Sequence, residues 1–556
     1  MMNYKRYKRN PVIELADRQW PNKEIKKAPV WCSVDLRDGN QALIEPMVVE
    51  EKIEFFKMLL DLGFKEIEVG FPSASQIEYD FLRQLIDRKL IPDDVTVQVL
   101  VQCREHLLKR TFEALEGLPK AIVHIYNSVS VLQRDVVFNM NKEQIKKIAV
   151  DAAGMVKEYA KEFPGEIILE YSPESFTGTE VDYALEVCEA VIDTWGPTPE
   201  NKIIINLPST VEMNTPNVYA DQIEWMNRNF KNRDSIILSV HPHNDRGTGI
   251  AATELAILAG ADRVEGTLFG NGERTGNVDI LTIAFNMFSQ GIDPELNISR
   301  INDIIEVYER LTKMKVHERH PYAGKLVFTA FSGSHQDAIN KGMRAMRERQ
   351  STIWEVPYLP INPSDIGRDY EPVVRINSQS GKGGVAFILE TYFGYKLPKS
   401  MHKEFADVIQ SVSEKQGEVS PEQIRDEFVK CYIDRKEPLH FRRCKFEDIM
   451  EQEEGCTHTV VHYTDHGVEK SFEATGNGPI DAVLKGLKEE LNINVKVLDY
   501  TEHALGGGEG AHAAAYIHMV DINTGKATFG VGVSSNITRA SIRAMFSAIN
   551  RLNLRS

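Results

Sequence analysis

Cysteine is scarce in this sequence, and long apolar runs are missing. The six cysteines among 556 residues are scattered without a Cys-x-x-Cys pair, which argues against a thiolate zinc site or a disulfide framework and predicts reduced thiols in a cytoplasmic protein. A membrane-spanning helix needs about 18 or more consecutive apolar residues, and the sequence contains no such stretch. The basic N-terminus is followed by no apolar segment, so we also expect no secretion signal.

An excess of positive charge is missing as well. Lys and Arg number 65 against 81 Asp and Glu, so the net charge is −16, which disfavours nucleic acid and anionic membranes as partners. Two nucleotide-binding motifs are also missing: no Gly-x-Gly-x-x-Gly follows the first predicted strand, and the glycine-rich stretch Ser378–Gly384 lacks the spacing of a Walker A loop. With 42% hydrophobic and 26% charged residues, the composition is typical of a folded globular protein.

The first half of the chain has a regular alternation of strands and helices. Eight short runs rich in β-branched residues alternate with longer amphipathic segments, and they are Val30–Asp35, Ile67–Phe71, Val95–Leu100, Ala121–Tyr126, Ile167–Tyr171, Ile203–Leu207, Ile236–His241 and Arg263–Thr267. Eight strand–helix units match a (β/α)8 TIM barrel better than an open doubly wound sheet. In such a barrel the residues that end the strands line the mouth where catalysis takes place.

The alternation stops near residue 300. Four helical segments follow, Ile301–Lys313, His335–Gln350, Lys403–Lys415 and Pro421–Tyr432, with a Pro- and Gly-rich stretch, Val356–Gly384, between them. From about Cys456 the pattern predicts two strand–strand–helix halves, a repeated α/β module suited to sensing a small ligand. We therefore expect an N-terminal arm (1–27), a barrel that carries the catalytic residues (28–324), linker subdomains (325–436) and an α/β domain suited to regulation (437–556).

The sequence His241-Pro-His243 ends the seventh predicted strand. Residues i and i+2 of a strand point to the same side, so both imidazoles should face the barrel mouth. Two histidines suit a divalent metal that also needs a carboxylate, and Asp38, after the first strand, is the natural third ligand. Asn277 is a candidate fourth ligand through its amide oxygen. The alternative is that these histidines are ordinary hydrogen-bonded loop residues.

Other polar residues follow the predicted strands. Arg37 would place a cation beside the metal, where it can hold an oxyanion or enolate, although a structural ion pair is an alternative. Glu174 and Thr210 follow the fifth and sixth strands. His124 lies within the fourth strand, where a buried core histidine is an equal interpretation. The glycine-rich loop Gly270–Asn277 follows the eighth strand, a usual place for an anion or cofactor site in this fold.

These motifs resemble those of a known family. The segments Leu36–Gln41, His241–Asp245 and Gly270–Asn277 resemble the DRE-type metal-dependent Claisen-condensing barrels, and the similarity extends over nearly the whole chain. Three downstream blocks resemble the 2-isopropylmalate synthases of the longer bacterial type, namely Phe328–Gln336, Trp354–Pro360 and Asn377–Gly384. The C-terminal module resembles the leucine-binding regulatory domain of those enzymes.

The resemblance implies an activity and a set of site residues. It implies transfer of an acetyl group from acetyl-CoA to 3-methyl-2-oxobutanoate, release of CoA by water, and leucine feedback on a homodimer. The implied metal ligands are Asp38, His241, His243 and Asn277, for Mg²⁺ first and Mn²⁺ or Zn²⁺ as alternatives. The implied catalytic residues are Arg37, Glu174, His335 and Tyr358, of which the last two reach the active site from the partner subunit. The implied substrate contacts are His124, Thr210, Asn271 and Glu273, and the implied leucine contacts are Tyr500, Ala504 and Ala511.

Several alternatives stay open at this stage. The base that removes the acetyl proton is His335 or a water that it activates, held by Glu174 or Tyr358. Homocitrate and citramalate synthases share the barrel motifs and differ in the pocket for the oxo-acid side chain. A metal-dependent acyl-CoA lyase or aldolase is a further alternative, but such an enzyme would not need the segments around His335 and Tyr358.

Overall fold

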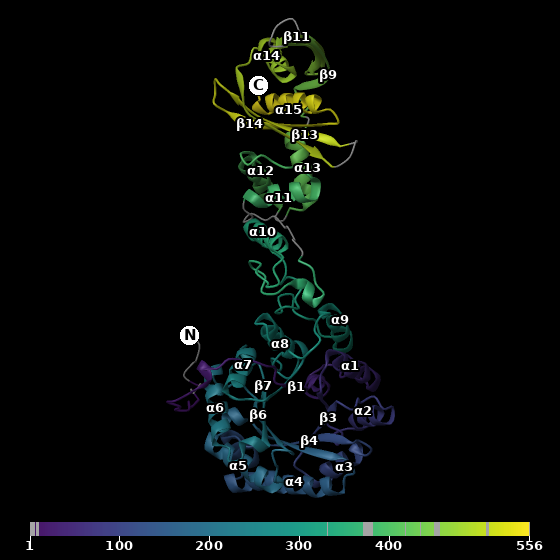
Figure 1. Cartoon of the computed structure of the whole chain (residues 1–556), viewed down its shortest axis with the longest axis vertical. Coiled ribbons are helices and arrows are strands. Elements are labelled where there is room, and N and C mark those ends of the chain that lie inside the picture. The colour runs from purple at the N-terminus through teal and green to yellow at the C-terminus, as the bar shows by residue number, and fades with distance from the viewer. Residues whose placement is uncertain are drawn as a thin grey trace. The chain divides into compact units, whose positions relative to one another are not determined.

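The computed structural model describes residues 6, 10–330, 332–370, 382–416, 419–433, 435–449, 456–506 and 511–554 (Figure 1). Phe331 and residues 371–381, which belong to sequence segments named above, lie outside the described residues. The chain divides into two compact units. The first is Met1–Phe328 with Ile361–Asp369, and the second is Thr329–Pro360 with Tyr370–Ser556.

The first unit contains a closed barrel of eight parallel strands, as the sequence predicts. The strands are β1 (Val30–Ser33), β2 (Glu66–Gly70), β3 (Thr96–Gln102), β4 (Lys120–Ser128), β5 (Glu166–Glu174), β6 (Ile203–Ser209), β7 (Ile236–Pro242) and β8 (Arg263–Gly266). The barrel closes because β8 pairs in parallel with β1, in the register Trp31 opposite Val264. This closure brings the two ends of the strand series together at one mouth.

Helices surround the barrel (Figure 1). They are α1 (Val49–Leu62), α2 (Gln76–Asp87), α3 (Glu105–Leu115), α4 (Lys142–Glu162), α5 (Val181–Trp195), α6 (Pro216–Asn229), α7 (Gly249–Ala259), α8 (Ile280–Ser289) and α9 (Ile301–Thr312). Helix α1 shows the pattern: it buries Ile53, Phe56 and Leu59 on one face and ends at Gly63, whose φ of 98° is the left-handed conformation that glycine adopts most easily. Helix α1 therefore docks on the barrel through its hydrophobic face. The carboxyl ends of the strands are left uncovered at the barrel mouth.

The second unit begins with four helices, α10 (Gly333–Arg349), α11 (Lys382–Phe393), α12 (Met401–Gln416) and α13 (Pro421–Tyr432). The sequence predicts all of them except α11. Helix α11 escapes a search for amphipathic periodicity because it is apolar around most of its surface. It buries Val385, Ile388 and Leu389 in a core shared with α12, α13 and the final sheet of the chain.

The last part of the second unit has two antiparallel sheets, each followed by a helix. The first consists of β9 (Leu439–Ile449), β10 (Cys456–Asp465) and β11 (Val468–Gly476) and precedes α14 (Pro479–Leu491). The second consists of β12 (Val495–Leu505), β13 (His512–Asp521) and β14 (Ala527–Ser534) and precedes α15 (Ile537–Leu552). The repeat that we predict, two strands and a helix, is thus corrected to three strands and a helix.

Strand β9 is a second element that the sequence analysis missed. A register shift opposite His462 and Tyr463 interrupts its pairing with β10. The inward-facing apolar residues Leu439, Phe441 and Cys444 are therefore not spaced by a constant two residues. Because the apolar residues of β9 do not alternate regularly, its sequence does not show the pattern of a strand.

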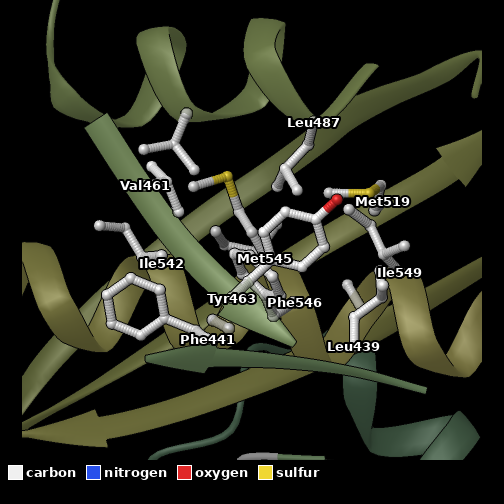
Figure 2. Close-up of a cluster of buried hydrophobic side chains, with 14 of the residues drawn as sticks. Leu439, Phe441, Val461, Tyr463, Leu487, Met519, Ile542, Met545, Phe546 and Ile549 are labelled. Atoms are coloured by element: carbon white, nitrogen blue, oxygen red, sulfur yellow. The ribbon is translucent and has the colours of Figure 1, made fainter. Parts of the chain in front are cut away.

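One hydrophobic core joins the two sheets to α14 and α15. Figure 2 shows Tyr463, Leu487, Met519 and Phe546 pointing into it from strands of both sheets and from both helices. Helix α15 lies directly on β14, since a Cβ built on Gly532 would come within 2.1 Å of a helix carbonyl oxygen. Within the described ranges, every helix falls short of the length or hydropathy that crossing a lipid bilayer requires.

Candidate active site

A cavity of about 260 Å³ opens at the mouth of the barrel, and all its lining residues belong to the first unit. They are Arg37, Asp38, Gln41, Leu100, His124, Tyr126, Ser172, Glu174, Asn206, Pro208, Thr210, His241, His243, Glu273 and Arg274. Most come from the ends of strands or from the segments directly after them. The cavity therefore brings together eight of the site residues named from the sequence: Arg37, Asp38, His124, Glu174, Thr210, His241, His243 and Glu273.

Four of the predicted metal ligands converge beside this cavity. The Nε2 atom of His241 lies 3.2 Å from Oδ2 of Asp38 and 2.9 Å from Oδ1 of Asn277. Nε2 of His243 lies 3.8 Å from the same Asp38 oxygen. One ligand atom from each of Asp38, His241 and His243 falls within 4.8 Å of the others, and all three side chains are buried. Two imidazole nitrogens, a carboxylate and an amide oxygen are a donor set that suits a divalent cation.

Hydrogen bonds from neighbouring groups orient two of these four side chains, His241 and Asn277. His241 and His243 alternate along and just beyond β7, so both turn to the same side. Nδ1 of His241 lies 2.8 Å from a carboxylate oxygen of Glu265, which directs Nε2 toward Asp38 and Asn277. The amide nitrogen of Asn277 donates to the carbonyl of Asn271 at 3.0 Å, which leaves its oxygen facing His241. His241 and Asn277 thus have the outer hydrogen bonds that metal ligands commonly have, whereas Nδ1 of His243 is buried without a hydrogen-bond partner among the described residues.

The charges at the cluster are strongly coupled. Burial alone would raise the pKa of Asp38, but Arg37 and the hydrogen bond from His241 outweigh it and lower that pKa well below its ordinary value. Burial alone would lower the pKa of His241, but Asp38 and Glu265 raise it to about 9. Burial and the neighbouring His241 lower the pKa of His243 to about 4. Near neutral pH Asp38 is therefore a carboxylate and His243 a neutral imidazole, which are the ligand forms that cations require, whereas His241 carries a proton that a bound cation would displace.

Arg37 lies at the cavity edge in a turn of π-helical geometry, Asp35–Gly39, that follows β1. Its Nε donates to the buried carboxylate of Glu68, and one terminal nitrogen lies 3.5 Å from Asp38. The side chain is 13% exposed. Glu68 and Asp38 thus hold the guanidinium at the cavity edge, where it could bind an oxyanion. The same two contacts are also the structural ion pairs that the sequence analysis gave as the alternative role of Arg37.

The sequence analysis missed a layer of buried polar residues inside the barrel. It consists of Glu68, Gln98, Glu170, Arg263 and Glu265, each fully shielded from solvent. Glu265 accepts hydrogen bonds from Gln98, Asn206 and Arg263 as well as contacting His241. The sequence does contain a sign of this layer, because each of the five is a polar residue inside or at the start of a largely apolar predicted strand. A polar side chain buried in this way needs hydrogen-bond partners, and other polar side chains inside the barrel can supply them.

The predicted substrate contacts differ in their surroundings. Nδ1 of His124 lies 2.9 Å from Glu68, and its Nε2 lies 2.7 Å from the hydroxyl of Ser172. The hydroxyl of Thr210 accepts the backbone N–H of Ser175 at 2.9 Å, so its own proton is available to the cavity. Glu174 accepts a hydrogen bond from Ser128.

Some predicted site residues do not line the cavity. Asn271 is half-buried beside the cluster, and its amide is engaged elsewhere. His335 and Tyr358 belong to the second unit, where their rings lie 4.1 Å apart and both side chains are exposed. The cavity is also lined by residues that the sequence analysis did not identify as site residues, namely Gln41, Leu100, Tyr126, Ser172, Asn206, Pro208 and Arg274.

The predicted leucine contacts also lie in the second unit. Tyr500 and Ala504 are on β12, and Ala511 directly precedes β13. The hydroxyl of Tyr500 is hydrogen-bonded to Glu502 and, at 2.9 Å, to Ser541 of α15. These contacts link an edge strand to the helix that covers it.

Three family models match successive parts of the chain. Residues 28–307 match the model described as HMGL-like, residues 325–390 match "Alpha-isopropylmalate synthase, post-catalytic domain-like", and residues 418–553 match "LeuA allosteric (dimerisation) domain". Together they cover the barrel, the segment after it and the two-sheet module.

Full-length relatives are similar along the whole chain. A 2-isopropylmalate synthase of Clostridium acetobutylicum is 57% identical over 560 residues and covers 100% of both chains. One from Brucella suis is 56% identical over 98% of each chain, and one from Corynebacterium efficiens is 55% identical over 97% of this chain and 95% of the relative.

Proposed function

The chain belongs to the 2-isopropylmalate synthase family, and from this premise we propose that its barrel condenses acetyl-CoA with 3-methyl-2-oxobutanoate. A proton leaves the acetyl methyl group, the resulting carbon attacks the keto carbon of the oxo acid, and water then cleaves the thioester to give 2-isopropylmalate and CoA. The observation that carries the proposal is the convergence of Asp38, His241, His243 and Asn277 beside Arg37 at one cavity. Such a site serves a carbonyl that must accept negative charge.

We assign Asp38, His241, His243 and Asn277 as the residues that hold a divalent cation, Mg²⁺ first. When bound, a cation of this kind polarises the carbonyl of a 2-oxo acid as a Lewis acid. The buried carboxylate of Asp38 supplies the negative charge that the site needs, and Glu265 keeps His241 in the required orientation. Oxygen and nitrogen donors of this kind also suit Mn²⁺ and Zn²⁺.

The remaining cavity residues would bind and orient the two substrates. Arg37, held by Glu68, would offset the charge that develops on the keto oxygen. Thr210 would donate its free hydroxyl proton to the carboxylate of the oxo acid. His124 and Glu273 are substrate contacts that the family resemblance implies and that line the cavity, and Glu174 is a catalytic residue at the same cavity.

The proton on the acetyl group requires a base. His335, or a water molecule that it activates, is the base in this proposal, and the ring of Tyr358 at 4.1 Å supports its orientation. Both side chains are exposed in the second unit, so they are available to a neighbouring subunit. We therefore propose that they act in the barrel of the partner subunit of a homodimer.

The apolar part of the cavity lining supports a branched aliphatic oxo acid. Leu100, Tyr126 and Pro208 supply an apolar part of its lining. Burial of two methyl groups there is favourable, whereas a second carboxylate placed against Leu100 and Pro208 would lose hydration to side chains that offer no hydrogen bond. This favours 3-methyl-2-oxobutanoate over the dicarboxylic oxo acid of a homocitrate synthase.

The two-sheet module would supply feedback. Its match to an allosteric dimerisation domain supports a role for Tyr500, Ala504 and Ala511 in binding leucine. Leucine binding and catalysis would then be coupled reciprocally in binding terms. A cytoplasmic location is part of the same proposal and rests on the sequence analysis alone.

A thiol-release assay with acetyl-CoA and a panel of 2-oxo acids tests the proposal. We expect the highest kcat/KM with 3-methyl-2-oxobutanoate, loss of turnover after chelation, recovery on adding Mg²⁺ or Mn²⁺, and inhibition by leucine that Tyr500→Ala weakens. Preference for 2-oxoglutarate or pyruvate would reassign the substrate. Full turnover after exhaustive chelation would overturn the metal-dependent mechanism.

A further inference from the structure

Asn271 connects two segments that come from opposite ends of the barrel sequence. Its side-chain nitrogen donates to the carbonyl of Gly39 at 3.0 Å, across 232 residues of sequence. Gly39 directly follows Asp38 in the turn after β1. Asn271 itself belongs to the loop after β8. The contact therefore links the turn that carries Asp38 to the loop that carries Asn277.

The backbone carbonyl of Asn271 is equally occupied. It accepts the side-chain amide of Asn277 at 3.0 Å and the hydroxyl of Thr267 at 2.7 Å. The first of these bonds decides which way the Asn277 amide faces, because its nitrogen is used and its oxygen is left toward His241. Asn271 thus bonds to Gly39, next to the ligand Asp38, through its side chain and to the ligand Asn277 through its main chain.

Two glycines permit this close approach. A Cβ on Gly39 would lie 3.2 Å from the side-chain nitrogen of Asn271, tighter than ordinary van der Waals contact. A Cβ on Gly272 would lie 2.3 Å from the side-chain nitrogen of Asn277. The segments around Asn271 are therefore packed against each other, and the loop has little freedom to shift.

We infer that Asn271 is a positioning residue that holds Asp38 and Asn277 at a fixed spacing for the cation, and that it does not contact substrate. The inference deepens the proposed function and rests on the metal ligands assigned there. It replaces the substrate contact that the family resemblance implies for Asn271. The two roles predict different results: a positioning residue controls metal affinity, whereas a substrate contact controls the KM for the oxo acid.

The experiment titrates Mn²⁺ alone into the full chain after chelation and measures the dissociation constant by calorimetry. Asn271→Ala removes the side-chain bond to Gly39, beside the ligand Asp38, and leaves the main-chain bond to Asn277 in place. Loss of an outer hydrogen bond at a metal site typically costs about 10–100-fold in affinity, so we expect the dissociation constant to rise by about 10-fold, the lower end of that range. The KM for the oxo acid at saturating Mn²⁺ should stay unchanged. Asn271→Leu keeps the volume without the donor and should behave alike, which covers the case in which the alanine variant fails to fold.

Asn229→Ala is the matched control. Asn229, on α6, also donates its side-chain nitrogen to a backbone carbonyl, that of Trp225 at 2.7 Å, but it does not line the cavity. This variant should bind Mn²⁺ like the unmodified chain, and circular dichroism should show all variants folded.

Two outcomes overturn the inference. If Asn271→Ala or Asn271→Leu leaves Mn²⁺ affinity unchanged, Asn271 does not position the ligands, and a raised KM in the same variant would return it to the substrate contacts. His243→Ala separates this failure from that of the proposed function. If that variant binds Mn²⁺ as tightly as the unmodified chain, the metal assignment itself is wrong, and the inference falls with it.

Discussion

Replacing Gly272 by alanine should weaken metal binding while the barrel stays folded. Gly272 lies in the loop after β8, next to the side chain of Asn277. A Cβ built on Gly272 would lie 2.3 Å from the Asn277 side-chain nitrogen and 3.0 Å from its Cγ. Ordinary contacts between such atoms are about 3.5–4.0 Å. The added methyl group therefore cannot be accommodated unless Asn277 moves.

The size of the effect follows from these distances. Restoring ordinary contact requires a displacement of about 1 Å, whereas metal–ligand distances tolerate only about 0.2 Å. Overpacking of this kind costs about 1–3 kcal/mol. If the strain is relieved by displacing Asn277 from its ligating position, affinity for the cation falls roughly ten- to a hundredfold, since about 1.4 kcal/mol corresponds to a factor of ten.

The assay is calorimetric titration of Mn²⁺ into the chelated full chain, with thermal unfolding as a parallel measurement. Gly154→Ala is the matched control, because a Cβ on Gly154 in α4 meets a side chain only at 3.9 Å. That variant should bind Mn²⁺ normally and gain roughly 1 kcal/mol of helix stability. Unchanged Mn²⁺ affinity in Gly272→Ala would refute the argument that this loop holds Asn277 in ligating position.

Three further predictions concern the barrel core, the specificity pocket and the C-terminal module. Glu265→Gln removes a charge that pairs with the fully buried Arg263 at 2.9 Å, while Glu66 and Glu170 remain beside Arg263. The free energy of unfolding should therefore fall by about 1.5–3 kcal/mol, the contribution of a hydrogen bond to a charged group; an unchanged melting temperature in calorimetry would contradict this. Leu100→Ala enlarges the apolar side of the cavity and should reduce kcat/KM for 3-methyl-2-oxobutanoate by roughly 10–200-fold, with relative gain for a longer oxo acid; equal loss for both acids would argue against a specificity role. Gly532→Ala forces α15 away from β14 and should weaken both leucine inhibition, measured by leucine titration, and dimer stability, measured by light scattering. The control Gly478→Ala lies in the same domain, where its added methyl group meets open space, and it should change neither property.

Much of the barrel was predictable because its signals are local. A strand repeats every two residues and a helix every 3.6, so eight β-branched runs separated by amphipathic segments already indicate the fold. The same periodicity placed Asp38, His241 and Thr210 at strand ends, and the cavity contains all three. Helix α11 and strand β9 were missed for a related reason: one is apolar on most sides and the other is interrupted by a bulge, so neither shows its regular period.

The chain alone determined how many strands the barrel has and which residues stand at its mouth, because both follow from spacing along a single segment. Only the closed barrel decided that Glu68 holds Arg37, that Glu265 orients His241, and that the loop of Asn271 meets the turn of Asp38. These pairs join segments up to 232 residues apart. Strand register and barrel closure decide which residues meet in these pairs. The spacing of residues within one segment carries no information about register or closure.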